Sequence, residues 1–446
     1  MKPVVTELVP GAGEPGAAAS AGAAPGAGRT ATIAVVGLGY VGLPTALALR
    51  AGGRPVLGID VSGRRLAQVR ERRCDLTPAD HERLAEALGD PAGFTLTDSP
   101  ERLGEAEAVV ICVPTPIDAH HVPEIGALRA ACATVCEEAR RGQTIILTST
   151  THVGATRELL IEPLGRRGLR VGREVCVAFS PERIDPANTA FPQELVPRVL
   201  GADSERCAQR ARAVVAAVAP SVHLVSSPEA AEMTKLYENS FRAVNITLAN
   251  EMAEAARSLG LSATEIVDAA ATKPYGFMPF RPGPGVGGHC IPCDPHYLLW
   301  QLRAARHSMP MLERAMAGIA ERPRQVADRA GEVLSRQCAR GVAGARILIA
   351  GVAYKPGVAD VRESPALELI ELLERRGAEV AYCDPLVPLI ERPQGTLISV
   401  GDPDLADYDL LIAHTVHPGQ DLGLLEAAPA LLDCTYRVDS ETKVDL

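Results

Sequence analysis

The chain has 446 residues, a formal net charge of −10 and no block of lysines or arginines. This length suffices for two or three domains with a large core. The acidic balance argues against nucleic acid and anionic membranes as partners, and no run of about twenty apolar residues is present to span a bilayer. Eleven cysteines in mostly apolar segments are typical of reduced thiols and a cytoplasmic location.

Residues 1–29 are rich in Gly, Ala and Pro, so we expect a disordered tail. Strand and helix patterns then alternate as far as residue 225, which predicts a parallel, doubly wound sheet. The expected strands are residues 31–37, 55–60, 108–114, 143–148, 175–179 and 198–201, and the expected helices are residues 43–51 and 128–140. Residues 30–225 therefore form the first predicted domain.

The pattern changes near Ser226, where a central helical domain is expected over residues 226–325. One stretch in it has helical spacing without a breaker and predicts a single long helix, whereas another is rich in proline and glycine and predicts an irregular loop. The long helix is residues 228–259, the loop is residues 273–295, and further helices are residues 262–271, 298–305 and 311–334.

Strand and helix patterns alternate again in the last segment, residues 326–446. Strands are expected at residues 346–351, 379–384, 409–414 and 430–433, with a helix at residues 366–376. The predicted fold is α/β, with two Rossmann-like doubly wound domains joined by a central helical domain that contains a long helix.

A glycine pattern directly after the first expected strand indicates a dinucleotide loop. In such a loop the first glycine allows a tight turn, the second lets the backbone approach a pyrophosphate, and the third packs helix on strand. Here these are Gly37, Gly39 and Gly42. Asp60 ends the next strand, where an acid binds ribose hydroxyls, which favours NAD. Arg64 and Arg65 leave a 2′-phosphate, and so NADP, as an alternative.

Cys290 lies in a glycine-rich segment, residues 285–294, and we expect the absent side chains to let a substrate approach its sulfur. A thiol together with a nicotinamide cofactor suggests oxidation of an aldehyde through a thiohemiacetal and a thioester. His289, Cys293 and His296 raise zinc binding or a redox pair as alternatives. No second cysteine pair stands nearby, so no metal site is predicted.

Lys235 and Asn239 lie one helical turn apart and could together stabilise an oxyanion, or could be an exposed lysine and an unrelated polar residue. Residues 148–151 end one expected strand, and Glu182 follows another. Hydroxyl groups and a carboxylate there could position and activate a water molecule, or the threonines could cap the next helix.

Taken together, these segments resemble the UDP-glucose/GDP-mannose dehydrogenase family from about residue 32 to residue 432. The motifs that carry the resemblance are residues 37–44, 112–116, 180–183, 232–235 with Asn239, 287–290, 354–356 and 360–365. Members of this family oxidise C6 of a nucleotide sugar from alcohol to carboxylate with two NAD⁺. The resemblance implies a UDP-sugar substrate, NAD as cofactor, a homodimer or higher oligomer, and a C-terminal domain that binds the UDP-sugar.

The resemblance also implies catalytic roles. Cys290 is the expected nucleophile, and Asp294 helps the first step by holding a water or orienting Lys235. Lys235 and Asn239 stabilise oxyanions, and Glu182 drives thioester hydrolysis with Thr150 positioning the water. The residues expected at the cofactor are Gly37, Gly39, Tyr40, Val41, Gly42, Asp60, Thr115, Thr150 and Arg362. Those expected at the substrate are Glu182, Arg183, Lys235, Asn239, Arg242, Phe280, Gly287 and Lys355.

Residues 180–183 and 282–290 resemble the branch that acts on UDP-N-acetylglucosamine or UDP-N-acetylmannosamine. Arg183 stands where the UDP-glucose branch has phenylalanine, and it could bind an acetamido group or pair with Glu182 or Asp185. Cys293 stands where a lysine or an aliphatic residue is usual. The alternatives are a UDP-glucose 6-dehydrogenase and a non-catalytic nucleotide-sugar sensor.

Overall fold

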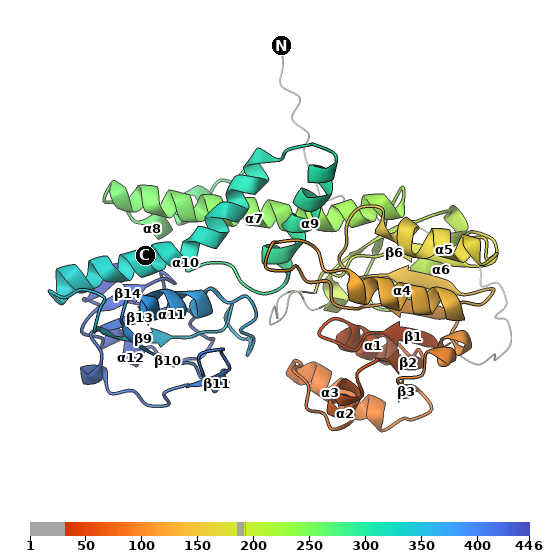
Figure 1. Cartoon of the computed structure of the whole chain (residues 1–446), viewed down its shortest axis with the longest axis horizontal. Coiled ribbons are helices and arrows are strands. Elements are labelled where there is room, and N and C mark those ends of the chain that lie inside the picture. The colour runs from red at the N-terminus through yellow and green to blue at the C-terminus, as the bar shows by residue number, and fades with distance from the viewer. Residues whose placement is uncertain (1–31, 185–190, 192) are drawn as a thin grey trace, which may run out of the picture.

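The computed structural model describes residues 32–184, 191 and 193–446, so the tail expected over residues 1–29 lies outside the described residues. Two α/β lobes are joined by long helices, and the predicted fold class is confirmed (Figure 1). In the described part of the chain, no helix is both long enough and apolar enough to cross a membrane.

The N-terminal lobe is built on a sheet with the strand order β3-β2-β1-β4-β5-β6-β7-β8. The strands are β1 Ile33–Val36, β2 Val56–Ile59, β3 Phe94–Thr97, β4 Ala108–Ile111, β5 Thr144–Leu147, β6 Cys176–Phe179, β7 Arg198–Ala202 and β8 Val222–Val225. The pairs among β1 to β6 are parallel, but β7 is antiparallel to β6. The predicted parallel sheet is therefore mixed at this edge, where an antiparallel pair needs no crossover helix.

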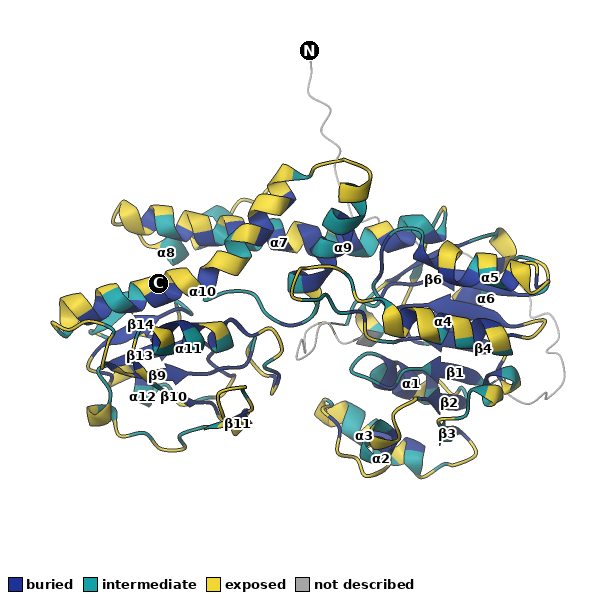
Figure 2. Cartoon of the chain, viewed as in Figure 1, coloured by how far each residue is buried: buried dark blue, intermediate teal, exposed yellow. Residues whose placement is uncertain are grey.

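The central strands of this sheet are apolar throughout because helices cover both faces. Ile33 and Val35 pack with the helices of one face, and Ala34 between them packs with those of the other. The first face carries α1 Gly42–Ala51, α2 Gly63–Arg70, α3 Pro78–Leu88 and α6 Glu205–Val215, and the second carries α4 Gly126–Glu138 and α5 Glu162–Arg166. In Figure 2 the central strands of this lobe are accordingly largely dark blue.

The longest helix, α7 (Pro228–Ser258), agrees with the prediction to within one residue. It begins where the Ser227 hydroxyl accepts a hydrogen bond from the Ala230 N–H, at 3.2 Å, with a proline in the first turn. Its 31 residues span about 46 Å, and Figure 1 shows it running above both lobes. The other central helices are α8 Ala263–Ala271, α9 Cys290–Ala304 and α10 Pro310–Gln337.

The loop predicted over residues 273–295 is wrong at its end, because α9 begins at Cys290. The prolines that suggested a loop are compatible with a helix here. Pro292 lies in the first turn, where backbone N–H groups have no intrahelical partner. Pro295 lies inside the helix, which continues through it.

The C-terminal lobe has a second sheet, with the order β10-β9-β13-β14-β15, and a small antiparallel pair, β11-β12. Its strands are β9 Arg346–Ala350, β10 Glu379–Cys383, β11 Leu389–Ile390, β12 Leu397–Ile398, β13 Leu410–Ala413, β14 Leu431–Asp433 and β15 Lys443–Asp445. The helix α11 (Pro365–Arg375) and α10 cover one face, and α12 (Gly423–Glu426) lies on the other. The second Rossmann-like lobe is thus present as predicted.

Candidate functional site

The glycine loop after β1 has the geometry that a dinucleotide needs. Gly37 has a φ of +87°, and a Cβ there would lie 2.5 Å from the Cys112 carbonyl oxygen. A Cβ on Gly42 would lie 1.8 Å from the Gly37 carbonyl oxygen, so both positions must be glycine for packing. A Cβ on Gly39 meets nothing within 4 Å. Gly39 therefore faces open space at the start of α1, where a pyrophosphate fits.

Asp60 is held beside this loop at the end of β2. Its carboxylate accepts hydrogen bonds from the Leu38 N–H at 2.8 Å and the Ser62 N–H at 2.9 Å. Each carboxylate oxygen keeps a further lone pair for a ribose hydroxyl. Arg65 donates to the Leu38 carbonyl oxygen at 2.7 Å, and Arg64 is exposed. These residues fit NAD.

Cys290 is the first residue of α9, and its side chain is exposed. The residue before it, His289, makes no side-chain capping bond, so the first-turn N–H groups are not satisfied by that side chain. Backbone N–H groups at a helix start favour a thiolate over a thiol. The position suits a nucleophile.

Two glycines before Cys290 are required for packing against the C-terminal lobe. A Cβ on Gly287 would lie 2.5 Å from the Glu363 carbonyl oxygen, and one on Gly288 would lie 2.8 Å from the Tyr354 ring. The Gly288 N–H donates to the Arg362 carbonyl oxygen at 3.0 Å. The glycines thus let the C-terminal lobe approach the start of α9, and the expected access of a substrate to the sulfur stays a prediction.

Asp294 follows Cys290 by one helical turn and is completely buried. Its Oδ2 accepts a hydrogen bond from the Asn239 side-chain amide of α7, and its Oδ1 has no hydrogen-bond partner in the described part of the chain. Burial raises the pKa of Asp294 from 3.8 to about 6, although Lys235, Asn239 and Thr150 all lower it. Asn239 is therefore not an unrelated polar residue, and α7 and α9 meet at this carboxyl group.

Lys235 is half-buried and is not the solvated surface lysine of the alternative reading. Its Nζ donates to the backbone carbonyl oxygen of Glu182, at 2.8 Å. His289 is influenced by both sides of the site, because its pKa is lowered by burial and then by the charges of Arg362 and Lys235. Cations from α7 and from the C-terminal lobe therefore converge beside Cys290.

The carboxylate of Glu182 is held by a partner that the sequence did not reveal. Its Oε2 lies 2.7 Å from Arg198, the first residue of β7, and both side chains are largely buried. Its Oε1 accepts hydrogen bonds from the backbone N–H groups of Arg183 and Ile184, at 2.7 and 2.8 Å. No local spacing links Glu182 to Arg198, because the mixed edge of the sheet brings them together.

The Arg183 guanidinium does not pair with Glu182, the one of its two expected partners that the structure describes. It forms an ion pair with Glu238 of α7 and donates to the Pro197 carbonyl oxygen at 2.9 Å. Asp185 lies outside the described residues. The Nε of Arg183 is buried without a hydrogen-bond partner among the residues the structure describes.

Arg362 of the C-terminal lobe reaches the glycine loop of the N-terminal lobe. Two carboxylate oxygens of Asp360 accept its hydrogen bonds at 2.6–3.0 Å, and its guanidinium carbon lies 5.0 Å from the centre of the Tyr40 ring. The structure therefore places Arg362 of the C-terminal lobe beside the glycine loop, as its expected contact with the cofactor requires. Lys355 lies on the same lobe, with its Nζ 5.8 Å from the centre of the Tyr354 ring.

The other residues expected at the cofactor or the substrate differ in how far they are buried. Thr115 is buried, and its carbonyl oxygen accepts the Tyr297 hydroxyl at 3.0 Å. The Phe280 ring packs edge-on against Phe241 at 6.0 Å, whereas Arg242 is exposed. Val41 precedes α1 and makes no side-chain cap.

The hydroxyl groups that end β5 do not cap the following helix. Thr148 donates to the Ile111 carbonyl oxygen at 2.8 Å, and Ser149 donates to the Val113 carbonyl oxygen at the same distance. The buried carboxylate of Glu232, from the α7 motif, instead accepts bonds from Gly154 and Thr156. Glu232 thus anchors α7 to the N-terminal lobe, a role that its position in the motif did not reveal.

The groups considered for zinc diverge. His296 stacks on His121 with ring centres 4.3 Å apart, and Cys293 is buried. Across the described ranges, no three His, Cys, Asp or Glu side chains converge in a way that could hold a metal ion.

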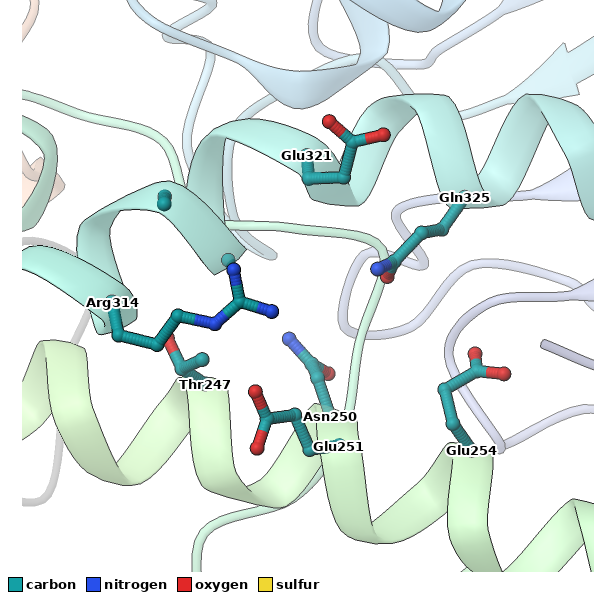
Figure 3. Close-up of a pocket in the computed structure, with 9 residues that line it drawn as sticks. Thr247, Asn250, Glu251, Glu254, Arg314, Glu321 and Gln325 are labelled. Carbon is teal, nitrogen blue, oxygen red and sulfur yellow. The ribbon is translucent and has the colours of Figure 1, made fainter.

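A cavity of about 500 Å³ lies elsewhere, between α7 and α10 (Figure 3). Its nearest α7 residue, Thr247, is roughly two helical turns beyond Asn239. Three glutamates and Arg314 face it, and it is separate from the groups around Cys290.

Comparisons with known proteins match three successive segments of the chain to the three domains of one family. The models of the UDP-glucose/GDP-mannose dehydrogenase family match residues 31–219 as the NAD binding domain, 229–318 as the central domain and 348–435 as the UDP binding domain. The UDP-N-acetyl-D-glucosamine 6-dehydrogenase of Pseudomonas aeruginosa is 31% identical over 93% of this chain and 98% of that protein.

Solved structures agree in fold. The UDP-D-ManNAc dehydrogenase of Pyrococcus horikoshii superposes with a TM-score of 0.82 at 30% identity, covering 93% of this chain and 98% of that one. A UDP-glucose dehydrogenase from Pyrobaculum islandicum gives a TM-score of 0.80 at 25% identity, covering 95% of this chain and 99% of that one.

Proposed function

Because the chain belongs to the UDP-glucose/GDP-mannose dehydrogenase family, it is an NAD-dependent oxidoreductase of nucleotide sugars, and we propose that Cys290 is the nucleophile of a four-electron oxidation at C6. The observation that carries this assignment is the convergence of Lys235, Asn239 and Asp294 around the start of α9. A non-catalytic sensor would have no need of this constellation.

Bound NAD⁺ supplies the hydride acceptor for each of the two oxidation steps. In the first step, Lys235 and Asn239 stabilise the alkoxide as the C6 hydroxyl becomes an aldehyde. Buried Asp294 keeps both groups oriented, since its carboxyl group accepts the Asn239 amide and lies near the Lys235 charge. The Cys290 sulfur then adds to the aldehyde carbon, and loss of hydride leaves a thioester on Cys290.

Water must then release the acid, and we assign Glu182 as the base, with Thr150 helping to position the water. Glu182 lines a cavity of about 30 Å³ together with Arg198, Thr148 and Ser180. A cavity of this size can hold about one water molecule with polar partners. The ion pair with Arg198 holds the Glu182 carboxylate in place beside this cavity.

For the substrate we propose a UDP-N-acetylhexosamine, either UDP-N-acetylglucosamine or UDP-N-acetylmannosamine. Support comes from the relatives named for these sugars and from the motifs at residues 180–183 and 282–290. The alternative, UDP-glucose, is favoured by the likeness to the Pyrobaculum islandicum enzyme. We place the UDP moiety against the C-terminal lobe near Lys355, and the sugar beside Gly287, Phe280 and Arg183.

The test is NAD⁺ reduction measured with UDP-N-acetylglucosamine, UDP-N-acetylmannosamine and UDP-glucose, in the wild type and in Arg183→Phe. The proposal predicts a higher kcat/KM for an N-acetylhexosamine, reduced toward that of UDP-glucose in the variant. If Arg183 hydrogen-bonds the acetamido group, the loss is on the order of a hundredfold. A wild-type preference for UDP-glucose would replace this substrate with the alternative.

We further propose a homodimer in which α7 pairs with its copy. Five large apolar side chains form an exposed stripe on this helix: Met233, Tyr237, Phe241, Leu248 and Met252. Tyr237 is 65% exposed in the single chain, and Figure 2 shows exposed residues along α7 and α8. Exposed Arg242 lies beside this stripe and could reach the partner's active site. Ala253 of the same helix is buried within its own chain and so lies outside this stripe.

Sedimentation of the wild type and of Tyr237→Glu tests the assembly. The expected result is a dimer that the charge in the stripe dissociates, because burying an unpaired carboxylate is costly. A fully active wild-type monomer at assay concentration would contradict the proposed dimer.

We also propose a cytoplasmic location, since buried cysteines such as Cys132 and Cys136 persist as thiols in reducing compartments.

A further inference from the structure

Two cysteines occupy the first turn of α9. Cys290 begins the helix and is exposed, and Cys293 lies three residues later with 3% of its surface exposed. Residues three apart in a helix have Cα atoms roughly 5 Å apart, within the span of roughly 4.4–6.8 Å that disulfides bridge. The backbone separation of the two cysteines is therefore compatible with a disulfide between them.

The start of α9 lacks one of the backbone hydrogen bonds of a regular helix. Pro295 has no backbone N–H, so the Ile291 carbonyl oxygen lacks the donor that an α-helix normally supplies four residues later. No side-chain cap from His289 fixes the helix start. The backbone between the two cysteines can therefore adjust by the small amount that an S–S bond requires.

The two thiols differ in reactivity. Cys290 lies at the helix start, where a thiolate is favoured and oxidants have access. Burial, with the charges of Asp294 and Glu363, raises the pKa of Cys293 to about 12. Cys293 therefore stays protonated and shielded until a modified Cys290 is presented to it.

We propose that a hydroperoxide oxidises Cys290 and that Cys293 then closes a reversible disulfide with it. In the first step the Cys290 thiolate attacks the peroxide, the O–O bond breaks, and sulfenic acid and an alcohol or water are formed. In the second step the Cys293 sulfur attacks the sulfenic sulfur, the S–O bond breaks, and the thiol proton leaves with the hydroxyl as water. The peroxide is reduced by two electrons, and the two thiols are oxidised by two.

The disulfide protects Cys290 from irreversible oxidation to sulfinic acid, and reduction by a dithiol restores the thiol. Its effect on turnover depends on the proposed function, because the disulfide removes the nucleophile. The bond itself depends only on the geometry of α9.

A second pair of neighbouring cysteines, both of them buried, provides a control. Cys176 of β6 and Cys207 of α6 are close enough to interact, and burial together with Cys207 raises the pKa of Cys176 to about 11. Both are buried in the N-terminal lobe, and neither is at a helix start that solvent reaches. We expect this pair to stay reduced under conditions that oxidise Cys290.

The experiment treats the full-length protein with hydrogen peroxide, alkylates remaining thiols and maps the peptides by mass spectrometry without reduction. The expected product is a link between Cys290 and Cys293 that dithiothreitol removes. Dehydrogenase activity should fall at least about tenfold and return with dithiothreitol. In Cys293→Ala the basal activity should be retained, but peroxide inactivation should become irreversible, with sulfinic acid at Cys290. Cys207→Ala should recover like the wild type.

Absence of the link in oxidised wild type, or full recovery of Cys293→Ala after dithiothreitol, would overturn the proposal. A link between Cys176 and Cys207 in its place would do the same. The mapping needs no turnover, so the link is scored even if no nucleotide sugar is oxidised. A link without any dehydrogenase activity would refute the proposed function and leave the disulfide standing.

Discussion

Replacement of Asp294 by asparagine should change how the stability of the protein depends on pH. Asp294 is completely buried, and its pKa in the folded chain is raised from 3.8 to about 6. The folded state therefore binds this proton more tightly than the unfolded state does. Its contribution to stability is fully present below the unfolded pKa and is lost as the pH rises through about 6.

The shift of 6 − 3.8, or about 2.2 pKa units, corresponds to about 3 kcal/mol. Asparagine keeps the shape of the side chain but does not ionise. The free energy of unfolding of the wild type minus that of Asp294→Asn should therefore fall by up to about 3 kcal/mol between about pH 4 and about pH 8. Urea unfolding of both proteins at a series of pH values measures this difference, and titrations common to both proteins cancel.

Asp384→Asn is the matched control, because its buried carboxylate has the opposite shift. It accepts bonds from His417 and from backbone N–H groups, and these lower the pKa of Asp384. The contribution of Asp384 to stability is present above its unfolded pKa and is lost as the pH falls. The free energy of unfolding of the wild type minus that of Asp384→Asn should therefore rise with pH. A flat or rising difference for Asp294→Asn would refute the inference that burial dominates at this carboxyl group.

Four further outcomes are expected. Cys290→Ser should nearly abolish acid formation while NAD⁺ titration still shows binding, since an alkoxide is far harder to form than a thiolate; normal turnover would remove the covalent mechanism. Glu182→Gln should give a burst of NADH and a covalent adduct by mass spectrometry, and neither would appear if another group activates the water. Gly39→Ala should leave the thermal midpoint of unfolding unchanged but weaken the binding of NAD⁺ at least about tenfold. Gly287→Ala, whose Cβ would lie 2.5 Å from a carbonyl oxygen, should instead lower the free energy of unfolding by roughly 1–3 kcal/mol. The reverse pattern would contradict the roles assigned to the two glycines. NAD⁺ should be used clearly better than NADP⁺, because Asp60 repels a 2′-phosphate, and equal use would assign a neighbouring arginine to that phosphate.

Sequence patterns located the parts of the site that depend on local geometry. The glycine loop with Asp60 was predictable because a strand end fixes their relative positions. One helical turn placed Lys235 and Asn239 on one face, but this spacing alone left an exposed lysine and an unrelated polar residue as the alternative. The length of α7 was predictable because no breaker interrupts its 31 residues.

The contacts between lobes could not be predicted in the same way. The glycine at position 287 is required by the backbone of residue 363, and Glu182 is held by Arg198 across the mixed edge of the sheet. Both depend on chain segments that meet only in the folded protein. The start of α9 was missed because proline and glycine signals in residues 273–295 outweighed the tolerance of a first helical turn for proline.

The most direct measurement of the central claim is the amount of NADH formed from a limiting quantity of UDP-N-acetylhexosamine. A four-electron oxidation through Cys290 predicts two NADH for each sugar carboxylate, and none of the acid from Cys290→Ser. One NADH with an aldehyde as the final product, or the full yield of acid from Cys290→Ser, would contradict the account.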